Sequence, residues 1–172
     1  MPTRIDELGN GSASASDIFL HVQTKRAGKI KGESKTAGHA DDIHIAAWSW
    51  GVAANTAIGS TERTARRSYK NLLLTKGVDS ASTGLMSALV TNDEVREATL
   101  SMRKAGGSAL DYFRLTLKGA RVTSFDIDVG ADGRPLERFA IAFTKVEIEY
   151  KLQQSAGTSG ASYSFTDEVL PG

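Results

Sequence analysis

Much of this chain alternates apolar and polar residues with a period of two. Such alternation puts successive side chains on opposite faces of a β-strand. In 144–152 the apolar series Val146, Ile148, Tyr150, Leu152 is interleaved with Lys145, Glu147, Glu149, Lys151. Similar runs occupy 17–22, 95–103, 109–117 and 121–129, and GADGRP (130–135) supplies a turn. The pattern predicts a mainly β fold, an antiparallel sandwich or barrel.

One segment has helical spacing instead. Asp79-Ser80 offers an N-cap, and it precedes an apolar stripe of Leu85, Met86, Leu89 and Val90. A helix of about three turns is marginal alone, so we expect it to pack against the sheets.

Two segments depart from simple alternation. In 139–143 both strand faces are apolar, and in 43–52 Trp48 and Trp50 share one face while small residues including Ala47 and Ser49 share the other. A sheet with one solvated face needs no such pattern. Two interpretations stay open: the strands are central in a two-layer core, or another subunit covers their outer face. The small residues equally fit close packing against the helix or a smooth open surface.

The polar segment 25–42 is too long for a hairpin connection, which favours a functional or interface role. It contains His39, Asp41 and Asp42, and His44 follows. Their spacing matches no established zinc motif, and a strand would place Asp42 and His44 together with Asp41 opposite. We therefore interpret this region as a solvated loop with a strand-edge histidine and expect no metal.

Composition narrows the function classes further. The 172 residues carry 21 Lys+Arg against 20 Asp+Glu, for a net charge of +1, and no cysteine. The balance argues against a nucleic-acid module, and the missing cysteines exclude disulfides and thiolate chemistry. No stretch reaches membrane-spanning length, and the polar N-terminus predicts no secretory signal, so any export would proceed without a cleaved peptide. We expect a flexible tail at 1–16 and a single domain at 17–168.

No enzyme signature is found in the sequence. G-x-S-x-G, P-loop and H-E-x-x-H motifs are all missing. Glu147 and Glu149 alternate with lysines, which is typical of a solvated strand face. The sequence thus predicts neither catalytic residues nor a cofactor.

Three blocks together resemble a known family. They are K-G-E-S-K-(x)3-H-A-D-D-I-(x)4-W-S-W-G at 31–51, M-R-K-A-G-G with Y-F-R-L-T-L-K at 102–118, and F-T-K-V-E-I-E-Y at 143–150. In order and spacing they are similar to the haemolysin-coregulated protein (Hcp) family, the tube protein of bacterial type VI secretion. The resemblance spans about 17–152, and the tail at 1–16 is an addition to the family pattern.

The resemblance implies a small β-barrel of two antiparallel sheets with one short helix packed alongside. It also implies a homohexameric ring that stacks into a tube, is driven out by a contractile sheath, carries a tip spike protein, and holds effector proteins in its lumen. Such a subunit is cytoplasmic before firing and secreted afterwards. It would bind no nucleic acid and insert in no membrane.

The resemblance also suggests residue roles. Trp48 and Trp50 would anchor the core, and Ala47 and Ser49 would face the lumen. The long loop would govern ring stacking through four of its charged residues, namely Lys29, Lys31, Glu33 and Lys35. The competing hypothesis is a monomeric β-sandwich binding module that uses the basic loop 25–35, and a mass in solution separates the two.

Overall fold

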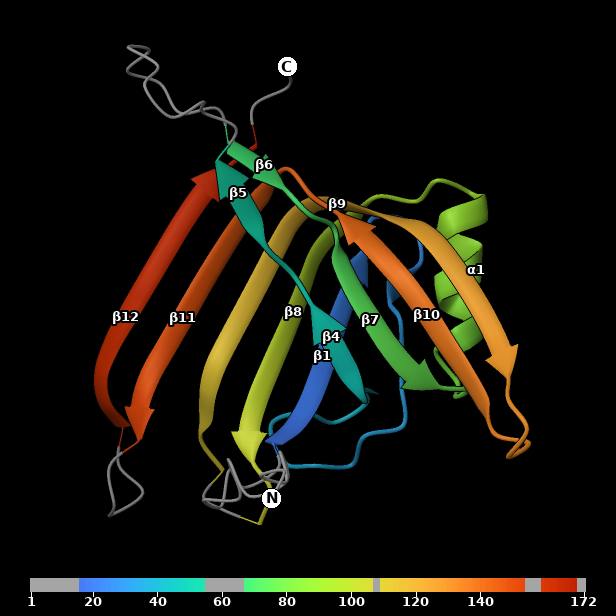
Figure 1. Cartoon of the computed structure of the whole chain (residues 1–172), viewed down its shortest axis with the longest axis horizontal. Coiled ribbons are helices and arrows are strands. Elements are labelled where there is room, and N and C mark those ends of the chain that lie inside the picture. The colour runs from blue at the N-terminus through green and yellow to red at the C-terminus, as the bar shows by residue number, and fades with distance from the viewer. Residues whose placement is uncertain (1–15, 55–66, 107–108, 154–158, 170–172) are drawn as a thin grey trace, which may run out of the picture.

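The computed structural model describes residues 16–54, 67–106, 109–153 and 159–169, which form strands and one helix (Figure 1). The predicted tail at 1–16 lies outside the described residues except for Ser16. The elements in chain order are β1 (Ser16–Thr24), β2 (Gly28–Lys29), β3 (Ile43–His44), β4 (Ala47–Ser49), β5 (Val52–Ala54), β6 (Arg67–Tyr69), β7 (Leu72–Gly77), α1 (Ser82–Val90), β8 (Val95–Lys104), β9 (Asp111–Val129), β10 (Pro135–Ala142), β11 (Lys145–Gln153) and β12 (Ser159–Glu168).

The long strand β9 joins two layers of antiparallel strands. Its first half pairs with β8 and β11, while its second half pairs with β10. The change falls at Gly119, which has a φ of +53°, and where a Cβ would lie 2.2 Å from the hydroxyl of Thr144. A left-handed backbone and this close approach both require glycine. Gly119 therefore lets one strand serve both layers.

The first layer comprises β1, β2, β3, β8, the first half of β9, β11 and β12, and the second comprises the rest of β9, β10, β7 and β4. β5 and β6 form a separate two-stranded sheet. The predicted mainly β class, antiparallel pairing and single helix are confirmed. The described strands form one continuous ten-stranded network and this small sheet, with no closed barrel among them.

The core lies between the two layers. Leu20, Leu100 and Leu115 come from the first layer, and Leu74 and Phe139 come from the second; all are buried. The helix α1 covers one end of this core beside β9 (Figure 1). In the described residues no helix has the length and apolarity needed to cross a bilayer.

The helix differs from its prediction in its start and its buried face. Ala81 precedes the first turn, and the Asp79 carboxylate accepts its N–H at 2.9 Å. The buried side chains are Ser82, Leu85 and Ala88, at intervals of three, while Val90 is 78% exposed. The predicted stripe was therefore wrong for Val90, because α1 turns its small residues toward the sheets.

The structure divides one predicted strand and decides between the two interpretations of another. The run 43–52 is divided among β3, β4 and the start of β5. In 139–143, Phe139, Ala140 and Ile141 are all buried, and β10 ends at Ala142. This strand is central in the second layer, between β7 and β9.

A buried charge cluster lies where β7, β10 and the start of α1 meet. Lys76 Nζ is 2.6 Å from Glu137 Oε2 and 2.6 Å from Asp79 Oδ1. It also donates to Ser82 Oγ at 3.1 Å. Both Lys76 and Glu137 are fully buried. A buried ion pair fixes the relative placement of the elements that carry it, because separating the charges in an apolar interior costs free energy.

Candidate assembly surfaces

Ala47 and Ser49 lie on the outer face of the second layer. In β4 the exposure pattern is exposed, half-buried, exposed, and the register aligns Ala47 with Thr75 and Ser49 with Leu73. Leu73 is itself exposed. These small and medium side chains line a shallow hollow of about 420 Å³ over β4, β7 and β10. The alternation thus places both residues on the face opposite Trp48.

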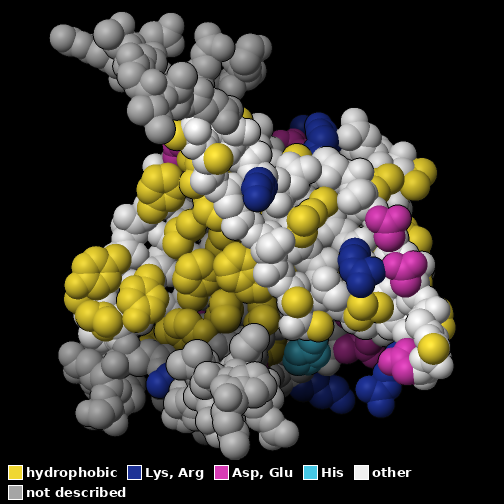
Figure 2. Space-filling view, viewed as in Figure 1, with side chains coloured by type: hydrophobic (Ala, Val, Ile, Leu, Met, Phe, Trp, Pro, Cys, Tyr) yellow, Lys and Arg dark blue, Asp and Glu magenta, His cyan; other side chains and the backbone are white. Residues whose placement is uncertain are grey.

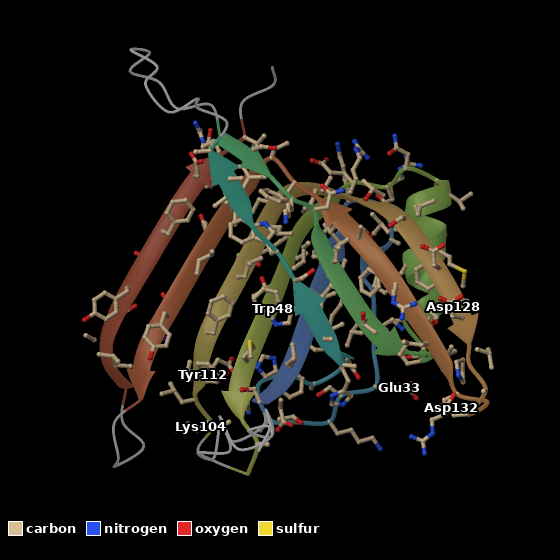
Figure 3. The ribbon with its side chains drawn as sticks, in the orientation of Figure 1. Glu33, Trp48, Lys104, Tyr112, Asp128 and Asp132 are labelled. Carbon is tan, nitrogen blue, oxygen red and sulfur yellow. The ribbon has the colours of Figure 1, made fainter. Side chains whose placement is uncertain are left out.

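Trp48 points the other way, from β4 toward β9 of the first layer (Figure 3). Its ring stacks on that of Phe113, with the centroids 5.6 Å apart. Trp50 stacks on Tyr69 at 5.7 Å and lies 6.3 Å from Phe143. Both tryptophans pack against the core while being only half-buried, and the buried Trp50 indole N–H has no hydrogen-bond acceptor among the described residues. They therefore sit at the border of the core.

Beyond Trp48 the described residues leave part of the inner face of the first layer exposed. Tyr150, Tyr163 and Phe165 on the inner face of β11 and β12 are 42%, 59% and 47% exposed. The register aligns Tyr150 with Tyr163, and their rings stack with centroids 6.5 Å apart. Figure 2 shows a broad apolar area here, next to β4 and β5. Apolar areas of this kind on a soluble protein mark interaction sites. We name it the open aromatic face, defined by Phe113, Ile148, Tyr150, Leu152, Tyr163 and Phe165.

β12 borders this face as an edge strand, since among the described strands it pairs only with β11. Near its end, Asp167 accepts hydrogen bonds from Tyr69 and Arg67 of β6. These bonds hold the pKa of Asp167 below its ordinary value. The short β5–β6 sheet is thereby tied to the edge of the open aromatic face.

The long loop folds back tightly on itself after β2. At Gly32 a Cβ would lie 2.4 Å from the carbonyl oxygen of Asp42, so only glycine fits there. This contact gives a physical reason for the glycine of the K-G-E-S-K motif. From Ile30 to Lys35, buried and exposed residues alternate, which presents every second side chain to solvent.

The four residues proposed for ring stacking differ in availability. Lys31, Glu33 and Lys35 are exposed, and Lys29 is half-buried. Lys29 instead reaches Asp42 Oδ1 at 3.0 Å and the carbonyl of Ala40 at 3.0 Å. Glu33 accepts the backbone N–H of Ser80 at 3.2 Å, just before α1. Two of the four therefore hold the loop in place within the chain.

The prediction of solvated acidic and histidine residues in this loop was wrong for His39 and Asp42. Both are buried, with His39 Nδ1 2.9 Å from Asp42 Oδ2. His39 also stacks on Phe19 of β1, with centroids 4.3 Å apart and planes 4° from parallel. Sequence spacing missed the cause, because Phe19 is an apolar residue on the outer face of the first layer and the loop folds over it.

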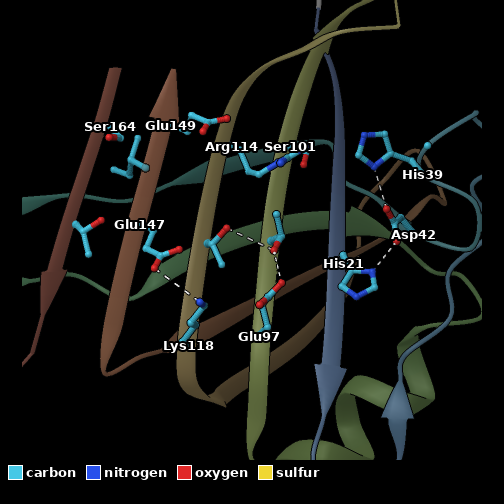
Figure 4. A pocket seen from close by; sticks show the side chains of 15 residues that line it. His21, His39, Asp42, Glu97, Ser101, Arg114, Lys118, Glu147, Glu149 and Ser164 are labelled. Atoms are coloured by element: carbon cyan, nitrogen blue, oxygen red, sulfur yellow. Dashed lines mark hydrogen bonds and ion pairs between the residues drawn. The ribbon is translucent and has the colours of Figure 1, made fainter. Parts of the chain in front are cut away.

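The outer face of the first layer carries a polar groove of about 500 Å³ beside this cluster (Figure 4). Thr99, Ser101 and Thr116 form part of its lining, and Lys118 and Glu147 lie across it with their charges 3.7 Å apart. Glu147 is 37% exposed, in keeping with its predicted solvated position.

The open aromatic face and the partners of His39 could not be identified from the sequence. Tyr150 was placed on an apolar face, but its lack of cover depends on how far β4 extends across β11, which no local pattern encodes. Asp111, which faces His39 from the start of β9, is 72 residues away in sequence. Only the folded arrangement brings them together.

Comparisons with known proteins agree on one family. Residues 19–150 match the family model described as "Type VI secretion system effector, Hcp". Protein Hcp1 of Pseudomonas aeruginosa is 31% identical over 147 residues, covering 83% of this chain and 88% of that protein. Hcp1 of Salmonella typhimurium superposes with a TM-score of 0.72 at 26% identity, covering 90% and 95% of the two chains. A type VI secretion effector from Yersinia pestis gives 0.71 at 25% identity, covering 89% and 100%.

Proposed function

Because the chain belongs to the Hcp family of type VI secretion proteins, we propose that six copies of it form a ring and that rings stack into a secretion tube. The subunit assembles in the cytoplasm and leaves the cell with the tube. Its partners are further copies of itself, the contractile sheath, the tip spike protein and effector proteins. Its role is structural and requires no catalytic residue.

The open aromatic face is the observation that carries this proposal. Tyr150, Tyr163 and Phe165 each expose more than two fifths of their surface in the single chain. Burial of apolar area contributes about 25 cal/mol per Å², so a neighbouring copy that covers this face gains free energy. A head-to-tail contact of this kind, repeated around an axis, closes into a ring.

The edge strand β12 supports the same arrangement. Its outer hydrogen-bonding groups have no strand partner among the described residues. Exposed edges invite pairing with other chains unless they are covered. A neighbour that covers the open aromatic face also shields this edge.

The outer face of β4 supports the lumen assignment. Ala47 and Ser49 are exposed, small, and surrounded by the shallow hollow over the second layer. Small side chains leave a bore open, and the Ser49 hydroxyl can donate or accept a hydrogen bond to cargo. In the ring this face lines the channel in which an effector rides.

In this proposal, exposed residues of the long loop make the contact between stacked rings. Lys31 and Lys35 are exposed, whereas Lys29 bonds within the loop to Asp42, and Glu33, also exposed, accepts the backbone N–H of Ser80. We assign the first pair to contact with the next ring and the second pair to holding the loop in position for it.

The test enlarges Ser49 and measures assembly and cargo separately. Ser49→Gln adds volume to an exposed face, so the ring should form with unchanged mass in light scattering. An effector that needs the lumen should then bind more weakly and accumulate less when co-expressed. Ser164→Gln is the matched control, because Ser164 is an exposed serine that lines the polar groove of the other layer.

Two outcomes contradict the assignment. Loss of the ring in Ser49→Gln would place Ser49 in a packed interface. Equal effector levels in Ser49→Gln and Ser164→Gln would show that Ser49 does not meet cargo. A single-chain mass for the wild type would contradict the ring itself and favour the monomeric binding module.

A further inference from the structure

His39 lies between two carboxylates that approach opposite sides of its ring. Nδ1 is 2.9 Å from Asp42 Oδ2, and Nε2 is 2.9 Å from Asp111 Oδ2. His39 is 6% exposed, so little of its ring is open to solvent. Figure 4 shows His39 above Asp42 at the end of the polar groove. The imidazole thus bridges its own loop to the start of β9.

Both carboxylates are ionised near neutral pH. Burial alone would raise the pKa of Asp42, but hydrogen bonds from His39, Lys29 and His21 outweigh it and lower the pKa. Burial likewise opposes ionisation of Asp111, and hydrogen bonds from His39 and Arg103 lower its pKa. An ionised carboxylate only accepts hydrogen bonds.

A neutral imidazole has one N–H, so it can satisfy one of these carboxylates and would turn a lone pair toward the other. The doubly protonated ring donates to both and adds its charge to each bond. Charge-assisted bonds of this kind are among the stronger ones in proteins. We infer that His39 is a proton-dependent lock, which in its doubly protonated form ties the loop from Ile30 to Asp42 onto β9.

The other charged groups around the ring stabilise the carboxylates and leave His39 as the bridging donor. Arg103 of β8 donates to Asp111 Oδ1 at 2.9 Å and lies over the Phe19 ring at 5.6 Å. Arg114 of β9 reaches Asp111 Oδ2 at 3.4 Å. Lys29 and His21 both contact Asp42 Oδ1, at 3.0 and 3.1 Å, and Asp17 of β1 is in register with Arg103.

The backbone bonds that the lock protects lie within the loop. Gly32 N–H donates to Asp41 O at 2.8 Å, Asp41 N–H to Ser34 O at 2.8 Å, and Ser34 N–H to Asp42 O at 3.1 Å. Breaking the bond between Asp42 and His39 releases the end of this loop, around Asp41 and Asp42. The hydrogen exchange of these three amides therefore measures whether the lock is formed.

The direction of the pH dependence follows from the donors and acceptors. The His39 contribution is present while the imidazole carries both protons and is lost when the ring gives up one of them, because one nitrogen then has no hydrogen to donate. The lowered pKa values of Asp42 and Asp111 give a contribution that is present above the ordinary aspartate range and lost in acid. The loop is therefore held most firmly when the ring carries both protons and both carboxylates are ionised.

Hydrogen exchange tests this in the intact chain. Protection factors of the Gly32, Ser34 and Asp41 amides, corrected for the intrinsic pH dependence of exchange, should fall about tenfold between pH 5.5 and pH 8.5, as expected for the loss of one charge-assisted bond. The core amide of Leu100 should stay constant. In His39→Gln the three loop amides should have low protection at both pH values.

His44→Gln is the matched control, because His44 is exposed and only tilts against Phe19; it should keep the wild-type profile. A wild-type pH profile in His39→Gln would overturn the lock, as would loss of the profile in His21→Gln.

If His39→Gln fails to fold, imidazole ¹⁵N spectra of the wild type at pH 6 decide. Two protonated ring nitrogens at His39 support the lock, and one unprotonated nitrogen contradicts it.

The lock is a property of the single chain and does not depend on assembly. Its consequence for tube stability rests on the proposed function, since the locked loop carries Lys31 and Lys35. Exchange of the loop amides and the mass of the ring are separate measurements, so failure of one proposal is distinguishable from failure of the other.

Discussion

The two ends of the space between the layers contrast sharply. Where β7 and β10 face β1 and β8, Phe139 and Leu74 are 1% exposed, and even Lys76 and Glu137 are buried as a pair. Where β11 and β12 extend past β4, Phe165 is 47% exposed and Tyr163 is 59% exposed. At both ends the strands carry apolar side chains on the face that points inward.

The two ends differ in whether other elements of the chain pack over the apolar face. The closed end has a second layer and a helix over it, whereas at the open end the described residues leave Tyr150, Tyr163 and Phe165 substantially exposed. A chain that completed its own core would have no need for Tyr150, Tyr163 and Phe165 on an inward face. The closed end therefore accounts for the stability of one chain, and the open end is the face that we propose a second copy covers.

We expect the largest difference in stability between two phenylalanine variants, one at each end. Phe139→Ala empties a fully enclosed site and should lower the free energy of unfolding by about 3–5 kcal/mol. Phe165→Ala removes a half-exposed ring and should cost about 1 kcal/mol in the dilute single chain. Urea denaturation of both variants at low protein concentration measures the difference, and equal losses would erase the contrast.

The next largest change in stability should come from the buried ion pair of Lys76 and Glu137. Lys76→Met leaves Glu137 charged and buried without its partner, which should cost about 3 kcal/mol. The double variant Lys76→Met, Glu137→Met should recover most of that loss, because neither charge remains. Thermal unfolding of the single and double variants forms the test, and a double variant weaker than both singles would count against it.

Trp48 is intermediate in burial between the side chains of the closed end and those of the open end. Its ring packs on Phe113 but is only half-buried. Trp48→Ala should therefore cost about 2 kcal/mol, less than a fully enclosed aromatic residue. Chemical denaturation gives the value. A loss as large as that of Phe139→Ala would show that Trp48 belongs to the closed end.

The smallest effect concerns the link between β6 and β12. The pKa of Asp167 is lowered by Tyr69 and Arg67, so its contribution is present above the ordinary aspartate range and is lost as the pH falls through its lowered value. Asp167→Asn should reduce the thermal midpoint slightly at pH 7 and leave it unchanged relative to wild type in strong acid. A variant whose deficit persists in acid would contradict the link.

The strands could be predicted from sequence because alternation is local. The face Val146, Ile148, Tyr150, Leu152 forms β11, with Val146 buried and Tyr150 and Leu152 exposed. Alternation assigns residues to a face but does not say whether another layer covers it. That depends on β4 ending before it crosses β11 and β12, which is a matter of tertiary packing.

The site was predictable to a similar extent. Alternation alone placed Ala47 and Ser49 opposite Trp48, as the register of β4 with β7 bears out. The histidine cluster was not predictable, because its second carboxylate, Asp111, comes from a distant strand and its stacking partner is an outward-facing Phe19. Local spacing carries no information on such contacts.

The central claim is that a second copy of the chain covers the open aromatic face. Light scattering at micromolar concentration tests it directly on the wild type and on the double variant Tyr163→Ser, Phe165→Ser. The account predicts a wild-type mass of about six times the 18.3 kDa of one chain, and a single-chain mass for a double variant that remains folded by circular dichroism. A wild type of single-chain mass, or a double variant that keeps the full ring, would contradict it.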